Sequence, residues 1–138
     1  MNPASLYFPL TNPQQEIWLT EKLFPGTPIG NIAGTLKIKG DYDINILEKA
    51  INETIKRNDG LRIRIIEQDG EPRQYISDYQ YKKIEFIDFS HKKIEELYKW
   101  DLAQTKKPFK LIDSDLYEFI IIKTSDDQYG IYAKYHHL

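Results

Sequence analysis

Apolar side chains recur at helical spacing in two parts of the chain, with charged residues between them. The first part runs from Asp43 to about Asn58 and carries the apolar stripe Ile44, Leu47, Ile51 and Ile55. The second begins at Ser90, a suitable N-cap, and runs to about Thr105 with the stripe Ile94, Leu97, Tyr98 and Leu102. Spacings of three and four residues put each stripe on one helix face, so the pattern predicts two amphipathic helices.

A third, shorter helix is predicted near the N-terminus, in residues 10–19. Asn12 can act as its N-cap, and Pro13 suits the first helical position because its missing N–H would have no helical partner there. Gln15 can then complete a capping box. The segment that follows, residues 23–34, contains the helix and strand breakers Pro25, Gly26, Pro28, Gly30 and Gly34. Their density predicts a loop.

Alternating or continuous apolar runs predict strands in residues 35–39, 61–67, 73–76, 83–89, 116–123 and 129 onward. Asp69 and Gly70 separate two of these strands and predict a type I′ hairpin, since both central positions of that turn need φ > 0. The run at 116–123 is almost uniformly apolar, as in a central strand covered on both faces. The predicted fold class is α/β: an α+β sandwich with helices packed on a mixed, largely antiparallel sheet.

The final predicted strand leads into two of the chain's histidines, His136 and His137. Because side chains alternate across a strand, this segment should present two opposite faces. One face carries Ile131, Ala133, Tyr135 and His137, and the other carries Tyr132, Lys134 and His136. One imidazole is therefore expected to face packed apolar surface and the other to face away from it.

Composition and charge narrow the class of protein. A chain of 138 residues with 41% hydrophobic and 29% charged residues fits one globular domain. The net charge of −2 is spread along the chain, so we expect no binding to nucleic acid or to an anionic membrane surface. The longest apolar run, Phe119–Ile122, is too short to span a bilayer, and the first residues lack a signal-peptide pattern, so a cytoplasmic location is expected. With no cysteine, thiolate metal sites are excluded, and we expect no metal and no directly bound cofactor.

Four stretches resemble, in order, the sequence patterns of condensation domains of non-ribosomal peptide synthetases. Thr11–Trp18 is similar to SxAQxRLW, with the Gln and Trp kept and the Ala and Arg replaced. Arg57–Ile65 is similar to RHExLRTxF, with both Arg and the Leu kept and the His, Glu and Thr replaced. Pro108–Leu111 together with Leu116-Tyr117 resembles the FDL…PL stretch that precedes the active-site strand, and Tyr135–Leu138 resembles the start of the catalytic motif HHxxxDG.

The resemblance implies a chloramphenicol-acetyltransferase-like fold of two similar halves with the active site in a tunnel between them. Residues 1–138 would be the N-terminal subdomain, truncated inside HHxxxDG before its Asp and Gly. The implied reaction is amide bond formation, in which the amine of a carrier-bound aminoacyl acceptor attacks a carrier-bound acyl or peptidyl thioester. The implied partners are carrier proteins, which hold these substrates on 4′-phosphopantetheine, and the missing C-terminal half.

The same resemblance assigns roles to three residues. His137 is placed beside the reacting amine, as a base or as a positioner, whereas His136 is structural. Arg62 matches the arginine that pairs with the Asp of the histidine motif, although an arginine on the solvated face of a strand fits the sequence equally well. Without that Asp, Arg62 is expected to meet solvent or another acid, and the isolated half is expected to have a disassembled, inactive site.

Two other functions fit the same residues. One is another acyltransferase of this fold that uses a coenzyme A or carrier-bound thioester. The other is a non-catalytic module that docks carrier proteins through exposed surface and the loop at Leu23–Gly34. Surface that belongs against a missing half would be exposed, so we also expect self-association through a face that includes Tyr132 and Tyr135.

Overall fold

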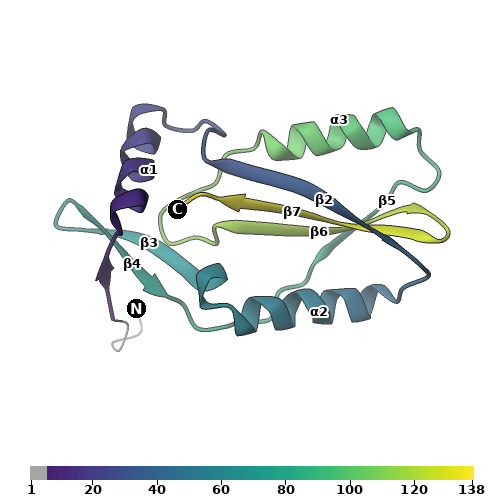
Figure 1. Cartoon of the computed structure of the whole chain (residues 1–138), viewed down its shortest axis with the longest axis horizontal. Helices are drawn as coiled ribbons and strands as arrows, with labels where there is room; N and C mark the ends of the chain where they lie inside the picture. Colours follow the sequence, from purple (N-terminus) through teal and green to yellow (C-terminus); the bar gives the residue numbers. More distant parts are fainter. Residues whose placement is uncertain (1–5) are drawn as a thin grey trace.

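The computed structural model describes residues 6–138, which form two β-sheets and three α-helices (Figure 1). The larger sheet has the order β2-β7-β6-β5, made of β2 (Asn31–Lys39), β7 (Gln128–His136), β6 (Tyr117–Ser125) and β5 (Glu85–Asp88). The smaller sheet has the order β1-β4-β3, made of β1 (Phe8–Pro9), β4 (Glu71–Ile76) and β3 (Ile63–Gln68). The helices are α1 (Asn12–Leu23), α2 (Ile44–Arg57) and α3 (Ile94–Thr105), with a 3₁₀ turn η1 (Asp59–Arg62) after α2. Within residues 6–138, none of the helices combines the length and the apolar character that crossing a bilayer requires.

The larger sheet lies between α2 and α3, which cover its opposite faces (Figure 1). On one face, Ile121 of β6 and Tyr129 of β7 pack against Leu47, Ile51 and Ile55 of α2. On the other face, the cluster near α3 consists of Phe89, Leu97, Ile120, Ile122 and Tyr132, with Trp100 against it. The central position of β6, predicted from its continuous apolar run, is confirmed, and its middle residues Ile120, Ile121 and Ile122 are buried whereas the flanking residues are partly exposed.

Two further predictions are confirmed because their causes are local. The helix predicted from Asp43 to about Asn58 is α2, and Asp43 caps it by accepting a hydrogen bond from the backbone N–H of Asn45 at 2.8 Å. Asp69 and Gly70 both have positive φ, 53° and 80°, in the turn that joins β3 to β4. The hairpin, however, belongs to a second sheet, so the expected single sheet is divided. Within the larger sheet, β5 pairs with β6 in parallel.

The predicted boundaries of the first helix and the following loop are wrong. Thr11, and not Asn12, is the N-cap of α1, and the side chain of Gln14, rather than Gln15, accepts from the N–H of Thr11 at 2.9 Å. The strand after α1 begins at Asn31, four residues before its predicted start. It does so because β7 offers a partner along the whole length, with Asn31 opposite His136.

The predicted buried stripe of α3 is confirmed at Leu97 and wrong at its other three positions. Ile94, Tyr98 and Leu102 are 46%, 62% and 56% exposed, and the helix starts at Ile94 rather than next to Ser90. Trp100 and Gln104 face the sheet together with Leu97, at equally helical spacing. Trp100 decides the rotation because its ring packs edge-on against Tyr132, with ring centroids 5.2 Å apart.

The expected self-association face must be revised for the same reason. Tyr132 is fully buried beneath α3, where its hydroxyl lies 3.1 Å from that of Thr105. Tyr135, on the other face, is half-buried and packs edge-on against Phe119. Tyr132 therefore cannot contribute to an exposed surface.

Candidate functional site

Strand β7 delivers the two adjacent histidines to the end of the larger sheet. The alternation predicted for its side chains holds through His136, since Tyr132, Lys134 and His136 are buried. The strand ends at His136, and His137 follows it with its side chain exposed. The two imidazoles therefore occupy opposite environments, one inside the protein and one at its surface.

The buried imidazole of His136 is held at both ring nitrogens. Its Nε2 lies 3.0 Å from Oε1 of Glu21 on α1, and its Nδ1 accepts the backbone N–H of Leu138 at 3.1 Å. His136 is only 9% exposed and Glu21 only 8%. Because Nδ1 accepts, the proton of the neutral ring sits on Nε2 and is donated to Glu21.

Burial lowers the pKa of His136 below its ordinary value, even though the hydrogen bond to Glu21 acts in the opposite direction. The ring is therefore neutral near pH 7. A neutral, doubly hydrogen-bonded imidazole is suited to holding structure and not to exchanging protons with a substrate.

Gly30 makes room for this pair. A Cβ atom at position 30 would lie 2.1 Å from Nε2 of His136 and 2.7 Å from Oε1 of Glu21. The carbonyl oxygen of Gly30 also accepts the backbone N–H of His137 at 3.0 Å. Sequence reasoning missed both residues, because Glu21 is an ordinary helical acid and Gly30 is one of several loop glycines. Gly30 stands directly before β2, but the sequence pattern placed the start of that strand only at residue 35, so the position of Gly30 gave no signal.

The buried side chain of Lys134 lies close to the hydrogen-bonded pair of His136 and Glu21. The Nζ atom of Lys134 is 2.9 Å from Oε2 of Glu118 and 4.7 Å from the ring centroid of Phe109. The Phe109 ring in turn packs edge-on against His136, with centroids 6.0 Å apart. Asn31 ties the same segment to β2 by donating to the carbonyl oxygens of Thr105 and Lys107. These contacts hold the ring of Phe109 against the imidazole of His136.

Arg62 lies at the end of η1 and forms an ion pair with Asp59, three residues earlier in the chain. Its side chain is largely buried, whereas that of Asp59 is exposed. The expectation that Arg62 meets another acid thus agrees with the structure. The predicted site residues fall into separate pairs, Arg62 with Asp59 and His136 with Glu21.

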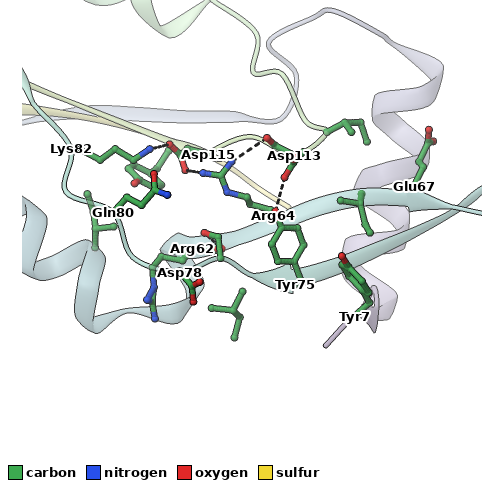
Figure 2. A pocket seen from close by; sticks show the side chains of 16 residues that line it. Tyr7, Arg62, Arg64, Glu67, Tyr75, Asp78, Gln80, Lys82, Asp113 and Asp115 are labelled. Carbon is green, nitrogen blue, oxygen red and sulfur yellow. Dashed lines mark hydrogen bonds and ion pairs between the residues drawn. The ribbon is translucent and has the colours of Figure 1, made fainter. Parts of the chain in front are cut away.

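Arg62 also lines a polar cavity of about 640 Å³ next to the smaller sheet (Figure 2). Asp115 bridges Arg64 and Lys82 there, with both contacts at 2.6 Å. The hydroxyl of Tyr75 donates to Oδ1 of Asp113 at 2.5 Å, and burial together with this contact raises the pKa of Tyr75 to about 12. The bridged charges make this wall rigid. Among residues 6–138, no three His, Cys, Asp or Glu side chains gather closely enough to hold a metal ion.

Comparison with known families decides the class of this protein. The family model described as the condensation domain matches residues 6–138. The chain belongs to the condensation domain family. The resemblance seen in the four sequence stretches is thereby confirmed.

Relatives of this condensation domain chain are much longer. Surfactin synthase subunit 1 of Bacillus subtilis (strain 168) is 39% identical over 137 residues, which cover 96% of this chain and 4% of the relative. A plipastatin synthase of the same organism is 36% identical over 132 residues, which cover 95% of this chain and 5% of that relative. The chain thus spans about a twentieth of the curated relatives it matches.

Solved condensation domain structures share the fold. The starter condensation domain of rhizomide synthetase superposes with a TM-score of 0.88 at 28% identity, over 96% of this chain and 33% of that one. The first condensation domain of the CDA synthetase gives a TM-score of 0.85 at 21% identity. These matches confirm the predicted α/β fold class of the condensation domain type. The roles of His137, His136 and Arg62 in catalysis stay predictions.

Proposed function

We propose that this chain is the N-terminal subdomain of a condensation domain in a non-ribosomal peptide synthetase. The complete domain would join a carrier-bound acyl or peptidyl thioester to a carrier-bound aminoacyl acceptor through an amide bond. The observation that carries the proposal is the exposed His137, presented directly after the buried His136, in a chain whose residues 6–138 match the family.

The chemistry follows from the imidazole of His137. An imidazole can accept a proton from an amine or hold it by a hydrogen bond. The acceptor amine would attack the thioester carbonyl carbon, the C–N bond would form, and the C–S bond would break. The proton lost by the amine would pass to the leaving thiolate. His137 would carry that proton or orient the amine by a hydrogen bond, and both roles are consistent with its position.

Two supporting residues complete the proposal. His136 would hold the segment, and Arg62 would stabilise the loop that follows the histidines through a charge-assisted bond. Arg62 is paired with Asp59 in this chain, which supports the proposal that the site is not assembled around His137. We therefore expect the isolated chain to make no amide product.

Substitution of His137 tests this proposal in the complete domain. His137→Ala should lower amide formation by a factor on the order of 10² to 10⁴, as expected for loss of a general base or of a hydrogen bond to the reacting amine. Product from loaded donor and acceptor carrier proteins would be measured by mass spectrometry. His91→Ala removes an exposed histidine elsewhere and should have no effect. Equal activity of both variants would refute the role of His137.

Carrier-protein docking without catalysis is the second candidate, and exposed apolar side chains favour it. They lie at the end of α1 and in the connection to β2: Leu19, Leu23, Phe24 and Ile29, each more than half exposed. Titration of the complete domain with a loaded carrier protein separates the candidates, because saturable binding without amide product supports docking alone.

A further inference from the structure

We infer that Glu21 and Gly30 are positioning residues for His137, acting through the buried ring of His136. This inference rests on the proposed function of His137. It comes from hydrogen bonds that α1 and the start of β2 make to the last residues of the chain.

The backbone of His137 is held on both sides. Its own N–H donates to the carbonyl oxygen of Gly30 at 3.0 Å, and the next N–H, that of Leu138, donates to Nδ1 of His136 at 3.1 Å. The peptide groups before and after the Cα atom of His137 therefore both have fixed partners. Fixing them fixes the direction in which the exposed imidazole leaves the chain.

Glu21 makes the second of these contacts possible. Nδ1 of His136 can accept from Leu138 only while the ring proton is on Nε2, and Glu21 stabilises that tautomer by accepting the proton at 3.0 Å. Without an acceptor at position 21, the ring gains nothing from keeping the proton on Nε2. In the other tautomer, two N–H groups would face each other at Leu138, and the contact would be lost.

Gly30 determines where the His136 ring lies, because it has no Cβ atom in the space that the ring fills. The two closest atoms to a Cβ at this position would belong to the His136 imidazole, at 2.1 and 2.6 Å, so any other residue would displace it. On another side the ring meets the edge of Phe109. Glu21 therefore selects the tautomer of the His136 ring, and Gly30 determines the location of that ring. Neither residue needs to touch a substrate.

Nitrogen NMR of the chain tests these contacts directly. At pH 7.5, long-range proton–nitrogen spectra should show His136 as the Nε2–H tautomer, and the His137 amide should exchange slowly with solvent. Glu21→Gln keeps an acceptor oxygen and should preserve both signals. Glu21→Leu should mix the tautomers and speed exchange of the His137 amide at least tenfold, while Glu16→Leu, an exposed acid on the same helix, should change neither.

The inference fails if wild-type His136 carries its proton on Nδ1, or if Glu21→Leu leaves the tautomer and the His137 exchange rate unchanged. Should Glu21→Leu not fold, Glu21→Gln decides alone, because a switched tautomer in that variant contradicts the proposed role of the acceptor.

Kinetics in the complete domain separate this inference from the proposed function. Glu21→Leu should lower kcat by up to about 10²-fold with little change in KM, as expected when a reacting group is misplaced by about 1 Å, and Glu21→Gln should recover most of the rate. If Glu21→Leu is fully active while His137→Ala is inactive, positioning is refuted and the function of His137 stands. If the tautomer results hold but His137→Ala is active, the hydrogen-bonded arrangement stands and the proposed function falls.

Discussion

Gly30 leaves open the space that the His136 ring occupies, so even a methyl group at this position should destabilise the protein. We expect Gly30→Ala to lower the free energy of unfolding by about 1–3 kcal/mol, the usual cost of forcing extra atoms into a packed site, because its Cβ would overlap the His136 ring. Gly34→Ala is the matched control four residues along, since a Cβ there meets nothing within 4 Å. It should change stability by less than about 0.5 kcal/mol. Urea denaturation measures both, and equal midpoints would contradict the predicted overlap.

Glu48 is a buried acid that should make stability depend on pH. It accepts from the hydroxyl of Tyr81 at 2.7 Å and from the N–H of Ile84 at 3.0 Å, and these contacts lower its pKa to about 2. A carboxyl with a depressed folded-state pKa stabilises the protein above its unfolded pKa, about 4.5, and loses this contribution as the pH falls towards 2.

The urea midpoint of the wild-type chain should therefore fall between pH 5 and pH 3. Glu48→Gln should be less stable at neutral pH and should lose less stability over the same range, because its neutral amide has no proton to gain. Glu16→Gln, at an exposed position, serves as the control and should follow the wild type. A parallel pH dependence in Glu48→Gln would show that other acids are responsible.

At the scale of elements, α3 shows how packing selects one of two apolar faces. Leu97 and Leu102 are the same residue type on the same helix, but Leu97 is buried against the sheet and Leu102 is more than half exposed. Leu97→Ala should cost about 2–4 kcal/mol of unfolding free energy, as for a buried leucine, and Leu102→Ala less than about 0.5 kcal/mol. Thermal and urea unfolding would measure the difference. Similar large losses for both variants would support the stripe predicted from the sequence, which contains both leucines.

At the scale of the whole molecule, β2 is the edge of the larger sheet that can drive self-association. Within the described residues its only strand partner is β7, and its side chains Ile32 and Leu36 are 49% and 66% exposed. A nine-residue edge strand with exposed apolar side chains is a template for pairing with another copy.

We expect concentration-dependent dimers in sedimentation experiments. Leu36→Lys should weaken them because a charge on an edge strand opposes pairing, whereas Leu102→Lys on exposed α3 should not. A monomer at every concentration, or dimers insensitive to Leu36→Lys, would exclude this edge as the interface.

The sequence by itself determined the elements whose causes are local. The spacing of α2, the Asp69-Gly70 turn and the apolar run of β6 each depend on residues close together in the chain, so their patterns predicted the observed structure. The motif resemblance also located His136 and His137, and the family match bears out the class of protein.

Tertiary structure decided the contacts between distant segments. Glu21 and His136 are 115 positions apart, and no periodicity links an acid on the first helix to a histidine at the end of the last strand. The face of α3 depended on where Trp100 met Tyr132, and the length of β2 depended on its pairing with β7. Local patterns specify which faces are apolar, but only the packed chain determines which face is buried and which polar groups meet, because burial and pairing depend on partners that are far away in sequence.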